Sequence, residues 1–148
     1  PLVAYGSLSQ NLQGSELFQL DTEDPNKTEE EIKHDLEYRW QDFFAVANYL
    51  LDFCAELDAR SKDRDWLLEF AHKFITGDYF CCGFYQRQFL SETARNMLIA
   101  YIFYKARDFD SALKYTDLIP ALDWRATCTD WIQRRKEKAA DPSKGDSK

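Results

Sequence analysis

The sequence is poor in the residues that form tight turns, with five Gly and four Pro among 148 residues. A fold built from β-hairpins needs such residues at most of its turns, so this composition disfavours an all-β protein. Long hydrophobic runs are also missing, because no apolar stretch approaches the roughly 20 residues that cross a bilayer as a helix. A chain of this length fits one hydrophobic core, and we therefore expect a single domain without a membrane span.

Metal-binding cysteine patterns are absent as well. The four cysteines are Cys54, Cys81, Cys82 and Cys128, and no two of them form a Cys-x-x-Cys pair. The adjacent Cys81 and Cys82 would point about 100° apart on a helix, which makes a shared tetrahedral zinc site difficult. We expect buried, apolar-like thiols in the cytoplasm or another reducing intracellular compartment. A disulfide between Cys54 and one of the adjacent pair is the alternative.

The common catalytic motifs are not recognisable. The sequence shows no Ser-His-Asp or Cys-His arrangement, no glycine-rich phosphate loop and no paired-carboxylate motif. With two His and five Gly, the usual routes to hydrolysis and nucleotide binding have few parts to work with. We therefore expect a protein that is not an enzyme and that uses no cofactor.

Positive charge is scarce except near the C-terminus. Residues 1–37 hold nine Asp/Glu against two Lys, whereas residues 132–148 hold six Lys/Arg against three acids, and the whole chain has a net charge of −7. Such a chain repels polyanions on average, so DNA is excluded as the expected partner and RNA is disfavoured. The basic run 134–138 is interpreted as a solvated helix end, with contact to an acidic partner, RNA or an anionic membrane as the alternative. The partner we expect is another protein or a peptide segment.

Local patterns predict helices from Thr28 onward. Thr28 and Glu31 form a capping box, and apolar residues then recur at three- and four-residue intervals from Ile32 to about Leu57. A second helix carries Trp66 at its start and ends near Gly77. Residues 80–106 are predicted to form one helix, or two helices with Ser91 as the N-cap of the second. Two further helices are expected to start at Asp110 and at Asp123, and the chain is expected to fray from Arg134 onward.

The fold class that follows is all-α. We expect five or six antiparallel helices, arranged as a short array of helical hairpins or as a compact bundle. Residues 28–138 form the single helical domain. Residues 1–27 are expected to be an acidic, polar arm and residues 139–148 a disordered tail.

Aromatic residues are concentrated in the body of the chain, where residues 38–131 hold 21 of the 23 Phe, Tyr and Trp. Bulky rings can fill the gaps between a few short helices. Alternatively, a subset of them lines a partner-binding surface. Both interpretations are compatible with the composition.

Part of the chain resembles a tetratricopeptide repeat. Residues 74–85 align with residues 104–115 at an offset of 30, and both segments place Asp and an aromatic residue at a turn, then a small residue, then Tyr. The resemblance covers about 65 residues and implies a stack of helical hairpins with a concave peptide-binding face, as in a scaffold or adaptor. The residues that carry the second copy are Ala100, Tyr101, Tyr104, Ala112, Leu113 and Tyr115.

On this reading a partner segment docks in an aromatic groove, because rings anchor an interface and a guanidinium pairs with acids. The predicted binding residues are Tyr85, Phe89, Arg95, Tyr101 and Tyr104.

Two alternatives belong to another functional class. Residues 77–100 also resemble the helical nucleotide-binding and ribonuclease modules of prokaryotic toxin systems, in which catalysis needs an Arg followed closely by a His; Arg95 is present and no His follows it. The second alternative is a di-iron or di-manganese bundle, because two Glu-x-x-His motifs each place both side chains on one helical face, with Glu56 and Glu92 as further acids. Its candidate metal ligands are Glu31, His34, Glu69 and His72.

Overall fold

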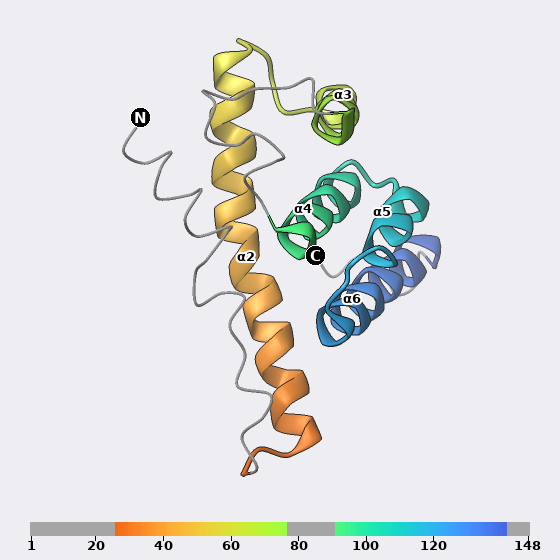
Figure 1. Ribbon diagram of the computed structural model, residues 1–148. Coiled ribbons are helices and arrows are strands. Elements are labelled where there is room, and N and C mark those ends of the chain that lie inside the picture. Colours follow the sequence, from red (N-terminus) through yellow and green to blue (C-terminus); the bar gives the residue numbers. More distant parts are fainter. Residues whose placement is uncertain (1–25, 77–90, 142–148) are drawn as a thin grey trace.

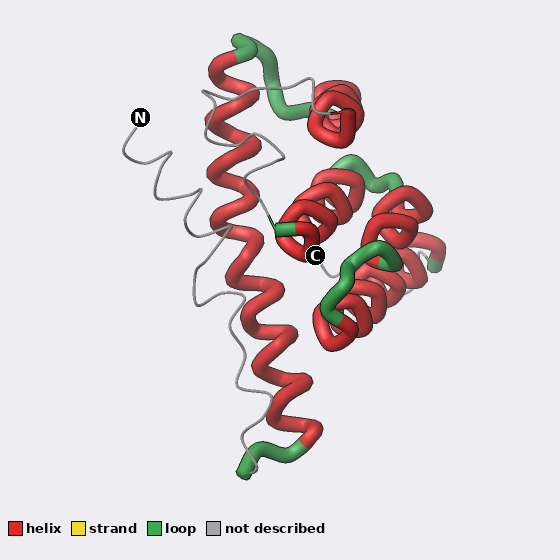
Figure 2. Tube along the Cα trace, viewed as in Figure 1, coloured by secondary structure: helices red, strands yellow, loops and turns green. Residues whose placement is uncertain are grey.

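The computed structural model describes residues 26–76 and 91–141, and these two stretches contain five α-helices and no β-strand (Figures 1 and 2). The expected all-α class is confirmed. None of the described helices is long and apolar enough to cross a membrane. The helices are α2 (Glu29–Leu57), α3 (Arg64–Thr76), α4 (Glu92–Lys105), α5 (Phe109–Thr116) and α6 (Leu122–Ala140).

The longest helix, α2, begins at the predicted capping box. The Thr28 hydroxyl accepts a 3.1 Å hydrogen bond from the Glu31 backbone N–H, and the Glu31 carboxylate accepts one of 3.1 Å from the Thr28 N–H. The chain leaves the helix through Ala59, whose φ of 55° is the left-handed conformation that commonly ends a helix. One apolar face of α2 is buried, as the sequence pattern predicts, and its members are Leu36, Trp40, Phe43, Ala47, Leu50, Leu51, Cys54 and Ala55.

The other helices gather on one side of α2, which runs the length of the described structure (Figure 1). Each of them contacts the next along the chain, α3 with α4, α4 with α5, and α5 with α6, while α2 contacts α4 and α6. Contact between consecutive helices is what a helical array requires, and many helical bundles share it. The tetratricopeptide resemblance therefore stays an expectation, and residues 77–85 of its first copy lie outside the described residues.

Helix α4 lies at the centre of the structure. It contacts all four other described helices, and every residue from 96 to 103 is buried. A helix that is buried all round is stabilised by packing on every face rather than along one stripe. Its start is capped as predicted, because the Ser91 hydroxyl accepts a 3.1 Å hydrogen bond from the Ala94 N–H. Whether residues 80–90 form a second helix falls outside the described residues.

Two predicted helix starts are displaced. Helix α5 is capped by Asp108 rather than opened by Asp110, and the Asp108 carboxylate accepts hydrogen bonds of 3.2 and 2.8 Å from the backbone and hydroxyl of Ser111. Helix α6 begins at Leu122, with Ala121 at the N-cap position and no side-chain cap, so Asp123 lies inside the helix. The prediction of a frayed end from Arg134 is wrong, because α6 continues to Ala140.

Candidate functional site

Two residues of the predicted binding groove lie in an aromatic cluster that joins α2, α4 and α6. Tyr101 is 2% exposed, and its ring stacks on Phe44 with 4.7 Å between ring centres. Tyr104 is half-buried, and its ring meets the edge of Trp131 at 4.9 Å. Trp131 also contacts Phe44, at 4.9 Å, and Trp40, at 5.9 Å. These rings fill the interior between three helices, as expected if the aromatic residues serve to fill gaps between short helices.

Burial of the cluster perturbs its polar atoms. The Asn48 amide donates a 2.9 Å hydrogen bond to the Tyr101 hydroxyl, yet burial dominates and raises the pKa of Tyr101 to about 12. The indole N–H groups of Trp40 and Trp131 and the Asn48 carbonyl oxygen are buried and have no hydrogen-bond partner among the described residues. The cluster is therefore tightly packed, although some of its buried polar atoms lack hydrogen-bond partners among the described residues, and the Tyr101 side chain is part of the hydrophobic core.

The remaining predicted groove residues do not complete a surface in the described structure. Arg95 is half-buried on α4 and makes no side-chain hydrogen bond or ion pair there. Tyr85 and Phe89 lie outside the described residues. The aromatic groove therefore stays a prediction, and the described helices offer a second candidate surface.

The two Glu-x-x-His motifs are not brought together. Within the described residues, no group of three or more His, Cys, Asp or Glu side chains is close enough to hold a metal ion. Glu31 closes the capping box of α2, and His34 is exposed on the same helix. The His72 ring packs edge-on against Phe103 with 6.1 Å between ring centres.

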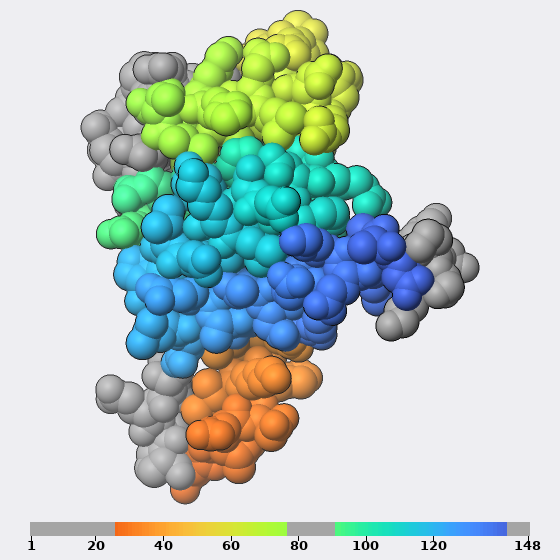
Figure 3. Space-filling model, turned by 90° about the vertical axis from the view of Figure 1, so that its right-hand side faces the viewer, coloured from red at the N-terminus to blue at the C-terminus, as the bar shows by residue number. Residues whose placement is uncertain are grey.

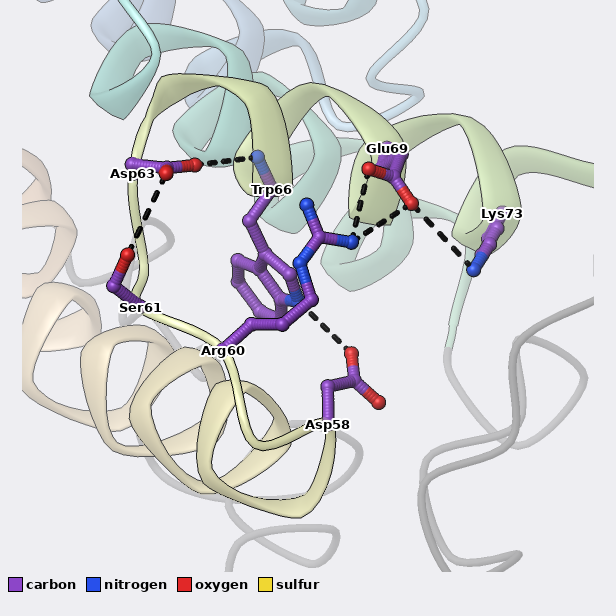
Figure 4. A network of polar contacts seen from close by, with 7 residues as sticks. All are labelled: Asp58, Arg60, Ser61, Asp63, Trp66, Glu69 and Lys73. Carbon is purple, nitrogen blue, oxygen red and sulfur yellow. Dashed lines mark hydrogen bonds and ion pairs between the residues drawn. The ribbon is translucent and has the colours of Figure 1, made fainter.

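Glu69 belongs to a polar network at the start of α3 (Figure 4). Its carboxylate accepts a 3.0 Å hydrogen bond from Arg60 and lies 3.8 Å from the Lys73 amine. In the same network the Asp63 carboxylate accepts a 2.9 Å hydrogen bond from the Trp66 backbone N–H, which is how an N-cap residue starts a helix. The network joins the α2–α3 turn to α3, so the structure gives Glu69 a structural role.

A groove lies between the N-terminal turns of α2 and the first half of α6. Its volume is about 520 Å³. In the space-filling view the N-terminal turns of α2 (orange) project beyond α6 (blue), and the groove lies where these segments meet (Figure 3). Its lining residues are Glu29, Ile32, Lys33, Leu36 and Glu37 from α2 and Asp123, Ala126, Thr127 and Asp130 from α6.

The groove combines apolar side chains with an excess of acids. Ile32 is half-buried and Leu36 is buried, while Ala126 on the opposite wall is exposed. Four lining residues are Asp or Glu and one is Lys. Leu122, which is 69% exposed, precedes Ala126 by one helical turn and extends the apolar side of α6. Leu122 therefore adds exposed apolar surface beside the groove.

Arg134 connects two of the acids that line the groove. Its guanidinium Nη2 lies 2.6 Å from Oε1 of Glu37 on α2, and its Nε lies 3.2 Å from Oδ2 of Asp130 on α6. The next residue, Arg135, places its guanidinium 3.7 Å from the centre of the Trp131 ring, one turn earlier on the same helix. The basic residues expected to lie in a frayed end therefore make contacts within a continuous helix.

Sequence reasoning missed this groove because its walls come from segments about 90 residues apart. The only local signal is that each wall occupies one helical face, at three- and four-residue spacing. That spacing identifies one face on each helix, but it does not show that the two faces lie opposite each other in the fold.

Comparison with protein-family models found no matching family, and comparisons with curated proteins and with solved structures found no significant match.

Proposed function

We propose that this chain is a protein-interaction module without enzymatic activity, an adaptor, scaffold or assembly subunit, that binds a segment of another protein in the groove between α2 and α6. The observation that carries the proposal is a groove in which apolar side chains and an excess of acids occur together on two helical walls. Apolar contacts provide most of the affinity of such a site, and charges at its edge select the partner.

The dimensions of the groove suit a peptide segment. A volume of about 520 Å³ is within the range of sites that enclose a few large side chains. Both walls are helices, so backbone hydrogen bonds define the shape of the site on either side. The acids disfavour nucleic acid, whose phosphates they repel.

A matched pair of substitutions tests the proposal. Ala126→Arg places a long side chain in the groove, whereas Ala45→Arg places the same side chain on an exposed position of α2 outside it. Peptides selected on the wild-type protein from a displayed library are synthesised, and their affinities are measured by fluorescence anisotropy. We expect Ala126→Arg to weaken binding at least tenfold and Ala45→Arg to leave it unchanged.

Thermal melting of both variants verifies that they fold. Equal affinities for the wild type and Ala126→Arg would refute the groove as the binding site, as would a library that yields no binding peptide.

A further inference from the structure

The charge of the groove indicates the chemistry of its occupant. Glu29, Glu37, Asp123 and Asp130 line it, with Lys33 as the single cation. Glu29 and Asp123 make no side-chain hydrogen bond or ion pair within the described residues. Acids that face a binding surface without a cation of their own favour a partner that supplies one.

The chain itself shows how a guanidinium fits this surface. Arg134 contacts Glu37 on one wall and Asp130 on the other, at 2.6 and 3.2 Å. All three side chains are substantially exposed, at 47%, 31% and 54%. Exposed ion pairs contribute only about 0–1 kcal/mol each, so a cation from a partner can replace Arg134 without a large loss.

We propose that the groove binds a cationic amphipathic segment of another protein, and that Arg134 occupies the place of one of its positive charges. This inference rests on the proposed function. Apolar side chains of the segment contact Ile32, Leu36 and Ala126, and its cations pair with the acids, displacing Arg134 from Glu37. Arg134 is thus an internal competitor that lowers the affinity for cationic partners.

Displacement of Arg134 leaves α6 in place, because a buried residue that does not line the groove anchors the helix to α2. Trp131 on α6 is 4% exposed and packs against Trp40 and Phe44 on α2. Replacement of Arg134 should therefore not unfold α6, which makes the substitution usable as a test.

The probe is a synthetic peptide with Leu at three- and four-residue spacing and Lys at the other positions; a second peptide carries Glu in place of every Lys. Affinity is measured at low and moderate salt for the wild type, Arg134→Gln and Lys138→Gln. Lys138 is an exposed cation of the same helix, outside the groove, so it controls for the change in net charge. We expect Arg134→Gln to bind the Lys peptide about threefold to fivefold more tightly than Lys138→Gln does, with the difference shrinking as salt rises. Asp123→Asn should weaken binding, and the Glu peptide should not bind.

Equal affinity of Arg134→Gln and Lys138→Gln for the Lys peptide would refute the competition. Binding of the Glu peptide as tight as that of the Lys peptide would refute the cationic partner. Either result leaves the proposed function standing as long as Ala126→Arg weakens binding of the selected peptides and Ala45→Arg does not. Loss of that contrast refutes the proposed function itself.

Discussion

The indole N–H of Trp66 donates a 2.8 Å hydrogen bond to the carboxylate of Asp58, at the turn that joins α2 to α3 (Figure 4). Trp40 is equally well buried, with exposed fractions of 0% for Trp40 and 1% for Trp66, yet its indole N–H has no hydrogen-bond partner in residues 26–76 or 91–141. Two tryptophans of the same core therefore differ in one polar contact.

That difference predicts unequal effects of Trp→Phe substitution. Both Trp66→Phe and Trp40→Phe leave a cavity, but only Trp66→Phe removes a hydrogen bond to a charged group, whereas Trp40→Phe removes an unsatisfied donor. We expect Trp66→Phe to lower the free energy of unfolding by about 1–2 kcal/mol more than Trp40→Phe does. Urea denaturation of the two variants measures the difference, and equal losses would contradict the expectation.

Stability at alkaline pH should depend on Tyr101. Burial raises the pKa of its hydroxyl to about 12, above the ordinary value of 10 that holds in the unfolded chain. The unfolded state therefore loses this proton first, so the Tyr101 contribution to stability is constant below about pH 10 and falls as the pH rises toward 12, by roughly 3 kcal/mol in total. In Tyr101→Phe this part of the alkaline decline should disappear.

The exposed Tyr49 provides the control, since Tyr49→Phe should retain the full decline. Unfolding free energies are measured by denaturant titration at several pH values. A decline in Tyr101→Phe as steep as in the wild type would show that other groups cause it.

Arg135 should tolerate lysine less well than Arg134 does. The Arg135 guanidinium lies over the Trp131 ring, 3.7 Å from its centre, and a lysine ammonium cannot reproduce this planar stack. We expect Arg135→Lys to lose about 1 kcal/mol of stability at low and at moderate salt. Arg134→Lys keeps exposed ion pairs and should change stability by less than about 0.5 kcal/mol. Thermal denaturation of both variants decides the point, and equal melting temperatures would argue against the stack.

Cys128 should resist thiol reagents in the folded protein. Its side chain is buried on α6, and burial raises the pKa of the thiol well above its ordinary value, so little thiolate is present at pH 8. Iodoacetamide should modify Cys128 in urea and not under native conditions, with peptide mapping by mass spectrometry to separate it from the other cysteines. Similar rates in both conditions would mean that the thiol is accessible.

The features that sequence predicted correctly are local ones. The capping box at Thr28, the apolar face of α2 and the Ser91 cap depend on residues within a few positions of one another. The same holds for the all-α class, which follows from the spacing of apolar residues. Such patterns need no knowledge of what packs against them.

The features that local patterns did not predict involve distant contacts. Helix α6 continues past Arg134, and there the Arg134 side chain pairs with Glu37, 97 residues earlier. The burial of Tyr101 could not be predicted from local pattern, because α4 is apolar on most sides and has no polar face from which its buried side chains can be distinguished. The groove could not be predicted either, because no local sequence pattern shows that α2 packs against α6.

The central position of α4 determines which parts of the protein unfold locally and which only with the whole structure. Because four helices cover it, its backbone amides reach water only when those helices separate, and they should exchange hydrogen for deuterium at the rate of global unfolding. Most side chains from 29 to 34 at the start of α2 are exposed, so these turns should open locally and exchange much faster. A segment bound in the groove would slow exchange in those turns far more than in α4, which would locate the binding site without any substitution.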